Sequence, residues 1–272
     1  MKINPVLLKR SVRISFSIIA GISTIAGIWG YTIKDICPSW EWWKWGLILI
    51  ACFFLISFFV FFIISKSRHL PYKTTINGKP VVIKTGDIFN EKGWKLIPFN
   101  DSFDTQVDDI IISHNSLNGQ MIDNYVDDID DINNAIVSAK SDPSTFRPLN
   151  KPGKLVYPLG RIIPYKDFLM LAFSHFDRQN MAYLGLGEYE SMLFSMWIEV
   201  RRVYAAKPIS IPLLGTGITT IAGDSDKDYT DMLKCILGSL KKSKFRPENG
   251  ISIVLTKEAM EKIDMSKIRE DY

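Results

Sequence analysis

The sequence has little cysteine and lacks the common nucleotide-binding motifs. Its three cysteines, Cys37, Cys52 and Cys235, form no C-x-x-C pair and no metal-ligand spacing. Its three histidines have no spacing typical of a metal site or a catalytic triad. There is no G-x-x-x-x-G-K-S/T segment, and the glycine-containing stretch 185–190 lacks the third glycine of a dinucleotide fingerprint. These absences argue against a metal centre, a P-loop ATPase, a kinase and a dehydrogenase.

Charge is absent from two N-terminal stretches, 14–33 and 45–65. Each is long enough to cross a bilayer as a helix that rises about 1.5 Å per residue. The first also contains small residues, which suit close helix packing in lipid. We therefore expect a two-helix transmembrane hairpin over residues 1–66, with spans at about 14–33 and 45–65. The alternative is a cleaved signal peptide, which has a basic start here but no small-x-small cleavage site.

The distribution of basic residues predicts the orientation of this hairpin. Lysine and arginine are concentrated before the first span and after the second, whereas the connecting segment has Lys34 and Lys44 offset by two acidic residues. By the positive-inside rule, both termini are then cytoplasmic. Tryptophans gather at the outer end, as in an aromatic belt, at Trp40, Trp42, Trp43 and Trp45. We therefore expect a multi-pass membrane protein with the rest of the chain in the cytosol.

The formal net charge of +4 belongs to the membrane flanks. Residues 1–73 contain nine Lys/Arg and two Asp/Glu, which leaves 24 basic and 27 acidic residues in 74–272. A slightly acidic C-terminal part has no basic patch of the kind that binds phosphodiester backbones. We therefore expect no nucleic-acid partner.

After an expected linker at 67–79, the remaining chain alternates between short β-branched strands and amphipathic helices. Apolar residues recur at i, i+3, i+4 and i+7 in 188–206, 226–243 and 121–139, which predicts helices. The predicted strands are Val81–Thr85, Trp94–Phe99, Leu155–Leu159, Phe168–Ser174, Ile209–Leu214 and Ile251–Thr256. This alternation is typical of an α/β sheet with helices on both faces.

The segment 208–221, PISIPLLGTGITTI, is the most informative for function. An apolar strand is followed by Gly215-Thr216-Gly217, and such loops at the carboxyl edge of a sheet can present backbone N–H groups to a phosphate. Glycine suits that position because a Cβ would block both the tight turn and the close approach of a ligand. The alternative is that the two glycines serve turn geometry only.

Three segments together resemble the macro domain, an ADP-ribose-binding α/β fold: VIKTGDIF (82–89), KLIPFN (95–100) and IPLLGTGI (211–218). The resemblance covers most of 80–260. It implies that residues 80–272 form a cytosolic macro-like domain with a mixed sheet flanked by helices.

The same resemblance implies the positions of a ligand. Asp87 would accept a hydrogen bond from the adenine amino group, with the Ile88 backbone beside it, and Asn100 would lie near the distal ribose. A carboxylate suits the first task because it only accepts. The alternatives are a turn or helix N-cap for Asp87 and a strand-end turn for Asn100. The predicted ligand-binding set is completed by Asp104, Leu214, Gly215, Thr216, Gly217 and Ile218.

One departure from the family pattern indicates a particular group of macro domains. Hydrolytic macro domains commonly carry N-A-A-N and then a glycine-rich loop, where this chain has PFNDSFDTQVDD at 98–109. The segments 95–118, 172–177 and PLLGTGITTI are instead similar to a narrower group. These are the bacterial two-span macro-domain effectors found beside TIR-domain enzymes in type II Thoeris antiphage defence.

That group implies a ligand sensor without catalytic residues, bound metal or cofactor. The expected ligand is an ADP-ribose derivative made by a TIR-domain protein, specifically a histidine conjugate. Binding would drive homo-oligomerisation and disruption of the bacterial inner membrane, so membrane lipid and further copies of the chain are expected partners. The alternatives are a membrane-tethered ADP-ribosyl hydrolase, in which Asn100 and Asp104 orient an attacking water, and a membrane scaffold with a vestigial pocket.

Overall fold

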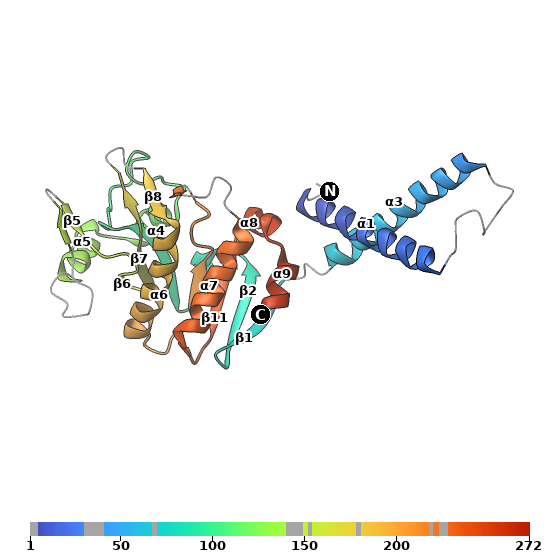
Figure 1. Ribbon diagram of the computed structural model, residues 1–272. Helices are drawn as coiled ribbons and strands as arrows, with labels where there is room; N and C mark the ends of the chain where they lie inside the picture. The colour runs from blue at the N-terminus through green and yellow to red at the C-terminus, as the bar shows by residue number, and fades with distance from the viewer. Residues whose placement is uncertain are drawn as a thin grey trace. The chain divides into compact units, whose positions relative to one another are not determined.

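The computed structural model describes residues 5–29, 41–66, 70–139, 149–151, 154–177, 181–217, 220–222 and 228–272 (Figure 1). The chain divides into two compact units. One contains residues 1–69 and 264–271, and the other contains residues 70–263 with Tyr272.

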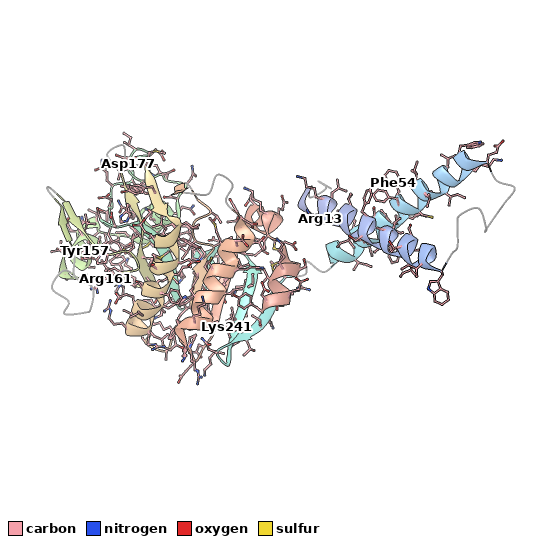
Figure 2. The ribbon with its side chains drawn as sticks, in the orientation of Figure 1. Arg13, Phe54, Tyr157, Arg161, Asp177 and Lys241 are labelled. Carbon is pink, nitrogen blue, oxygen red and sulfur yellow. The ribbon has the colours of Figure 1, made fainter. Side chains whose placement is uncertain are left out.

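The N-terminal unit contains two long apolar helices, α1 (Pro5–Ile28) and α3 (Trp42–Lys66). Windows of 18 residues in them reach mean hydropathies of 1.6 and 3.0, so both are long and apolar enough to cross a membrane. The rings of Phe16 and Phe53 meet edge to face at 5.3 Å, and Phe54 is 66% exposed (Figure 2). The two helices are consistent with the predicted hairpin. Residues 30–33, the end of the first predicted span, lie outside the described residues.

The larger unit is built on a nine-stranded mixed sheet in the order β1-β2-β11-β9-β3-β7-β8-β10, with β6 paired to β7. These strands are β1 (Tyr72–Ile76), β2 (Lys79–Thr85), β3 (Trp94–Asn100), β6 (Ile162–Tyr165), β7 (Phe168–Phe176), β8 (Ala182–Gly185), β9 (Ile209–Pro212), β10 (Thr220–Ala222) and β11 (Ile251–Leu255). A separate hairpin is formed by β4 (Leu149–Lys151) and β5 (Lys154–Val156). The helices are η1 (Ile88–Asn90), α4 (Leu117–Tyr125), α5 (Ile129–Ser138), α6 (Leu186–Val203), α7 (Tyr229–Ser243) and α8 (Lys257–Lys262). A further helix, α9 (Met265–Asp271), follows.

The centre of the sheet is parallel. Strands β2, β11, β9, β3 and β7 all run in one direction, with Ile253 of β11 in register with both Ile83 and Ile211. The carboxyl ends of parallel strands meet at one edge, where ligands of open α/β sheets bind. This arrangement places the segments after β2, β3, β7 and β9 at the same edge.

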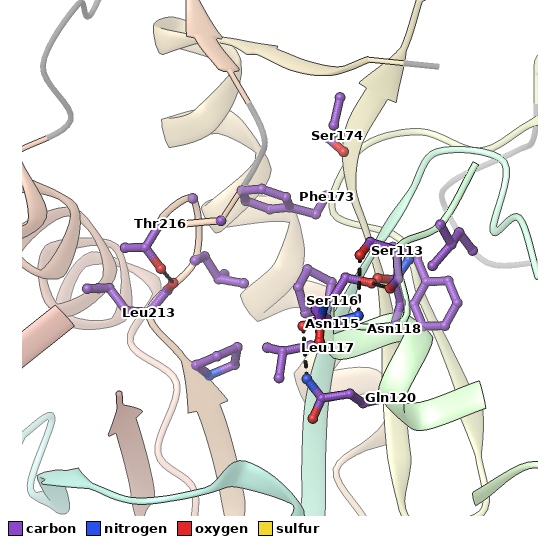
Figure 3. A pocket seen from close by; sticks show the side chains of 18 of the residues that line it. Ser113, Asn115, Ser116, Leu117, Asn118, Gln120, Phe173, Ser174, Leu213 and Thr216 are labelled. Carbon is purple, nitrogen blue, oxygen red and sulfur yellow. Dashed lines mark hydrogen bonds between the residues drawn. The ribbon is translucent and has the colours of Figure 1, made fainter. Parts of the chain in front are cut away.

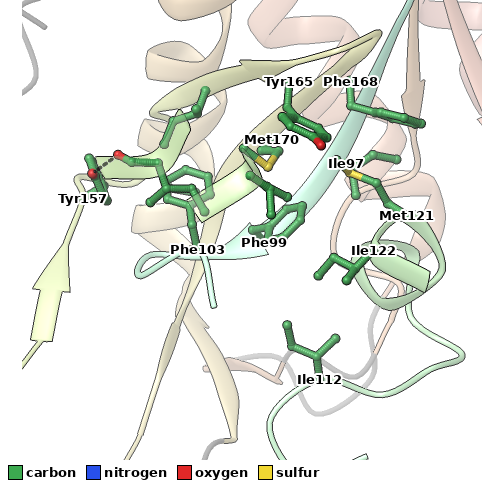
Figure 4. Packing of buried hydrophobic residues seen from close by; sticks show 14 of the residues in the cluster. Ile97, Phe99, Phe103, Ile112, Met121, Ile122, Tyr157, Tyr165, Phe168 and Met170 are labelled. Carbon is green, nitrogen blue, oxygen red and sulfur yellow. Dashed lines mark hydrogen bonds between the residues drawn. The ribbon is translucent and has the colours of Figure 1, made fainter. Parts of the chain in front are cut away.

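Helices cover both faces of the sheet. On one face, α4 and α5 close a hydrophobic core over β3 and β7, which includes Ile97, Phe99, Met121, Phe168 and Met170 (Figure 4). Side chains alternate along a strand, so odd-numbered residues of β7 point to the other face. There the Phe173 ring meets Tyr189 of α6 edge to face at 6.3 Å. The predicted α/β class with flanking helices is thus confirmed.

Two buried polar side chains that lie near α5 and α6 are paired. The Tyr157 hydroxyl donates to the Ile136 carbonyl at 2.6 Å, and the Arg161 guanidinium lies 3.4 Å from the buried Glu199 carboxylate (Figure 2). Glu199 also accepts from Arg202 at 3.0 Å. Such pairing is required because an uncompensated buried charge is strongly destabilising.

Several predicted boundaries differ from the structure. The expected linker 67–79 contains β1, because an Asn77-Gly78 turn with positive φ at both residues folds it back on β2 as a hairpin. The single helix predicted at 121–139 is two helices, since Asp128 accepts from the Asp130 N–H and starts α5 anew. The strand predicted at Leu155–Leu159 ends at Val156.

Candidate functional site

A cavity of about 490 Å³ lies at the carboxyl edge of the parallel strands (Figure 3). Its walls come from the ends of β3, β7, β9 and β11, the loop after β9, and the start of α4. This volume falls within the range of small-molecule sites, and the position is the one at which open α/β sheets bind their ligands.

The loop after β9 forms one wall. Gly215 has φ of +89°, a conformation that L side chains rarely adopt, so the position requires glycine. A Cβ on Gly217 would meet nothing within 4 Å, so the chain itself leaves the space beside this residue open. The two glycines therefore have different roles. Gly215 is needed for the turn, whereas Gly217 leaves the space beside the loop open.

Three hydroxyl groups hold the carbonyls of this loop. Thr216 Oγ1 donates to the Leu213 carbonyl at 2.9 Å, Tyr189 to the Leu214 carbonyl at 3.1 Å, and Tyr229 to the Thr216 carbonyl at 3.3 Å. Burial raises the pKa of the Tyr189 hydroxyl, which keeps it protonated and able to donate. The carbonyl oxygens are thus engaged by the protein.

Two N–H groups of the same loop, those of Gly215 and Thr216, differ from its carbonyls. Within the described residues, no acceptor occupies the backbone N–H of Gly215 or Thr216. Consecutive backbone N–H groups in a glycine turn form a concave site that favours anions. The loop therefore has the chemistry of a phosphate cradle. The predicted ligand residue Ile218 lies outside the described residues.

Asn100 lies in the cavity wall at the end of β3, where the register with β7 shifts between Phe99 and Asn100. Such bulges re-aim side chains next to functional sites. Asn100 is 3% exposed, and its amide group binds Asp104 twice: Nδ2 donates to the carboxylate and Oδ1 accepts from the Asp104 N–H at 2.9 Å. Asp104 is outside the cavity lining and holds Asn100 in place.

Asp87 and Ile88 follow β2 at the same edge but do not line the cavity. The Asp87 carboxylate caps η1 by accepting from Phe89 N–H at 3.0 Å and from the Asn90 side-chain amide at 3.3 Å. Ile88 is buried in the hydrophobic core. The structure therefore brings Asn100 and residues 214–217 together around the cavity and leaves Asp87, Ile88 and Asp104 outside its lining.

The opposite wall, which the sequence analysis did not assign, comes from the start of α4. Ser116 caps this helix by accepting from Gly119 N–H at 3.1 Å, and Gln120 Nε2 donates to the Asn115 carbonyl at 2.9 Å. Asn118 also faces the cavity from this helix (Figure 3). The residues of this wall that line the cavity are polar and uncharged except for the apolar Leu117, and they lie between 113 and 120.

An ion pair lies beside the cavity on the face of β7 that α6 covers. His175 Nδ1 is 2.7 Å from the buried Asp101 carboxylate, and Nε2 is 3.5 Å from Glu188 of α6. The hydrogen bond to Asp101, aided by the charge of Glu188, raises the pKa of His175, against its partial burial. This pair ties β3, β7 and α6 together next to the site. In the described chain, these three residues included, no group of three His, Cys, Asp or Glu residues is arranged to hold a metal ion.

Comparison with known proteins identifies the domain. Residues 81–256 match the family described as "Thoeris protein ThsA, Macro domain". Thoeris protein ThsA of Bacillus amyloliquefaciens (strain Y2) is 40% identical over 206 residues, which cover 72% of this chain and 68% of that protein. The chain belongs to the Thoeris ThsA macro-domain family. The predicted resemblance to macro domains, and among them to those of Thoeris systems, is thereby confirmed.

Solved macrodomains of Oceanobacillus iheyensis also align with this Thoeris macro domain. One, with ADP, has 16% identity and a TM-score of 0.45, and the alignment covers 73% of this chain and 95% of that chain. Another, with MES bound, has 15% identity and a TM-score of 0.46, with coverage of 74% and 98%.

Proposed function

We propose that this chain is a Thoeris effector that senses an ADP-ribose-derived signal with its macro domain and acts on a membrane through α1 and α3. One observation carries the proposal. In the loop after β9, protein hydroxyls engage three carbonyls, while the N–H groups of Gly215 and Thr216, which line the cavity, have no acceptor among the described residues. A diphosphate supplies the missing acceptors.

The polar wall at the start of α4 supports a ligand larger than ADP-ribose alone. It lies across the cavity from the glycine loop and beside Asn100, where the distal ribose is expected. Neutral hydroxyl and amide groups can both donate and accept, so they suit an adduct with mixed polarity. We infer a conjugate with an amino acid, specifically histidine, made by a TIR-domain protein.

Signal transmission requires that the ligand bind one assembly state more tightly than the other. Each tenfold shift of that equilibrium needs about 1.4 kcal/mol of differential affinity. Two apolar helices cannot enclose a pore alone, so action on the membrane requires several copies. We infer that binding promotes homo-oligomerisation in the bacterial inner membrane, with both termini cytoplasmic, and disrupts that membrane.

The test uses the full chain in detergent micelles. Calorimetry compares ADP-ribose, its histidine conjugate and AMP, which lacks the second phosphate, and light scattering measures the protein mass in each mixture. We expect the conjugate to bind more tightly than ADP-ribose, AMP to bind least, and the mass to rise only with the tight ligand. Absence of binding by both ADP-ribose compounds would overturn the sensor, and an unchanged mass at saturation would overturn the ligand-driven assembly.

The hydrolase alternative is tested with the same sample. It requires Asn100 and Asp104 to orient a water molecule, yet both ends of the Asn100 amide are engaged by Asp104. Incubation with an ADP-ribosylated protein at enzyme excess is expected to leave the modification in place. Release of ADP-ribose would favour the hydrolase.

A further inference from the structure

Helix α6 joins the candidate site to an exposed apolar surface. On its buried side, Tyr189 donates to the Leu214 carbonyl of the glycine loop, and Trp197 Nε1 donates to Ser239 of α7 at 2.9 Å. On its outer side, Phe194 is 37% exposed and Ile198 is 55% exposed. A helix whose inner face supports a ligand loop thus presents large apolar side chains outward.

The outer side also has two small residues in the preceding turns. A rotation of about 100° per residue places Gly187, Ser191, Phe194 and Ile198 on one face of α6. The Ser191 hydroxyl donates to the Gly187 carbonyl at 3.0 Å, so this face presents a satisfied hydroxyl. The face therefore consists of a shallow half, at 187 and 191, followed by a protruding half, at 194 and 198.

Nothing in the described part of this chain requires glycine at position 187. Its φ is not in the left-handed region, and a Cβ built there would meet nothing within 4 Å. Gly187 is the second residue of α6, and glycine is a weaker helix former than alanine. Close approach of a second helix is the use that small residues serve at helix crossings.

Apart from the buried Glu199, which pairs with Arg161 and Arg202, the acidic and basic residues of α6 lie in opposite halves of the helix. Its first turns contain Glu188 and Glu190, and its last turn contains Arg201 and Arg202. Two copies packed antiparallel bring the acidic half of one helix near the basic half of the other. Parallel packing would bring like charges together, which is unfavourable.

We propose that α6 packs antiparallel against α6 of a second copy of this chain around a twofold axis. Ile198 then covers Gly187 of the partner subunit, and Phe194 covers Ser191 of the partner subunit. Both pairs share one midpoint, between positions 192 and 193, so a single axis satisfies both, as an isologous interface requires. The shallow half of each helix receives the protruding half of the other.

This interface supplies a contact surface for the proposed homo-oligomer. It rests on the proposed function only for its link to the ligand. Phosphate bound at the glycine loop contacts the segment that Tyr189 holds, and Tyr189 lies on the helix that forms the interface. The loop and the α6 pair are thus connected through one side chain.

Cysteine cross-linking tests the pairing in the full chain in detergent, with the three native cysteines replaced by serine. Ser191→Cys lies close to the proposed axis, whereas Glu248→Cys is exposed in a loop outside α6 and is the matched control. Because a disulfide needs Cβ atoms about 4 Å apart, we expect at least about fivefold more oxidised dimer for Ser191→Cys. Equal yields from the two variants would overturn the interface.

A pair of opposite charges introduced across the interface distinguishes loss of the interface from misfolding. Adding Ile198→Glu to Ser191→Cys places a carboxylate in the interface and is expected to abolish the cross-link. Adding Gly187→Lys as well supplies the opposite charge across the axis and is expected to restore most of it. Failure of this restoration would overturn the predicted register.

ADP-ribose binding, measured in the same samples, distinguishes the two proposals. Binding without a Ser191→Cys cross-link overturns the α6 interface alone. A cross-link without binding overturns the proposed function alone.

Discussion

The turn after β2 and the loop after β9 lie at the same edge of the sheet, separated by β11, and differ in how their polar groups are satisfied. In the first, the Asp87 carboxylate accepts from two groups of η1. In the second, hydroxyl groups engage the carbonyls, and the N–H groups of Gly215 and Thr216 have no acceptor in the described chain. Buried backbone groups are almost always paired, so the first turn is satisfied by the chain itself, whereas the second loop leaves donors for the ligand that we propose.

The largest effect is expected from a negative charge in the loop after β9. Gly217→Glu places a carboxylate beside the N–H groups that would hold a diphosphate, and we expect ADP-ribose affinity to fall by about 100-fold or more. Thermal stability should change little, because a Cβ at this position meets nothing within 4 Å. Calorimetry and thermal unfolding of the full chain measure the two quantities.

Gly217→Gln is the matched control, since it has nearly the same shape without the charge. If the loop binds an anion, the glutamine variant should retain clearly more affinity than the glutamate variant. Equal losses in the two variants would show that bulk, and not charge, is excluded at this loop.

A smaller effect is expected from the hydroxyl that holds the loop. Tyr189→Phe removes the hydrogen bond to the Leu214 carbonyl and leaves a buried acceptor unpaired, which typically costs about 1–3 kcal/mol. We expect weaker ADP-ribose binding, by about 10-fold, together with a lower unfolding temperature.

The control for Tyr189→Phe is Tyr165→Phe. The Tyr165 hydroxyl is buried and has no hydrogen-bond partner among the described residues, so its removal should leave binding unchanged and stability unchanged or slightly improved. Equal effects of the two substitutions would contradict a specific role for the Tyr189 hydroxyl.

The turn after β2 and the loop after β9 also illustrate which features could be predicted from the sequence and which could not. The position of the loop after β9 follows from a β-branched strand and two glycines, which are local signals. The roles of Tyr189 and Tyr229 cannot be predicted from local signals, because a tyrosine on an amphipathic helix has the same pattern as a core residue. Their hydroxyls reach the loop only through the packing of α6 and α7 against it. The Gly-Asp-Ile turn was located correctly, but its carboxylate is used within η1.

Other differences also reflect long-range packing or short turns. The Asn77-Gly78 turn is a strong local hairpin signal that the linker assignment overlooked. The polar wall from 113 to 120 enters the site because Ser116 starts α4 at the cavity, and a serine cap alone does not predict what lies opposite it. The alternation of strands and helices was enough for the fold class.

A direct test of the turn after β2 is Asp87→Ala. Loss of the η1 cap is expected to lower the free energy of unfolding by about 1 kcal/mol. Asp87→Ser restores an N-cap acceptor without a carboxylate, so it should recover most of that stability. If Asp87 also accepts from adenine, both variants lose similar affinity for ADP-ribose. If it only caps η1, the serine variant binds normally.

The smallest effect concerns the end of β7, where the ion pair of His175 and Asp101 adjoins the same edge. The pKa of His175 in the folded chain is raised above its ordinary value of 6.5, chiefly by its hydrogen bond to Asp101. The pair therefore contributes stability that is fully present below pH 6.5 and is lost as pH rises through the raised pKa. We expect this contribution to be about 1 kcal/mol or less, since the imidazole is partly exposed. Thermal unfolding between about pH 5.5 and pH 8.5 should show a falling stability in the native chain and a flatter dependence in His175→Gln.

His114 is the control for this measurement, because a hydrogen bond to Asp123 also raises its pKa but the pair is exposed. Exposed ion pairs contribute little, so His114→Gln should keep most of the native pH dependence. Should His175→Gln retain the full dependence and His114→Gln lose it, the Asp101 pair would not stabilise the strand ends around the cavity.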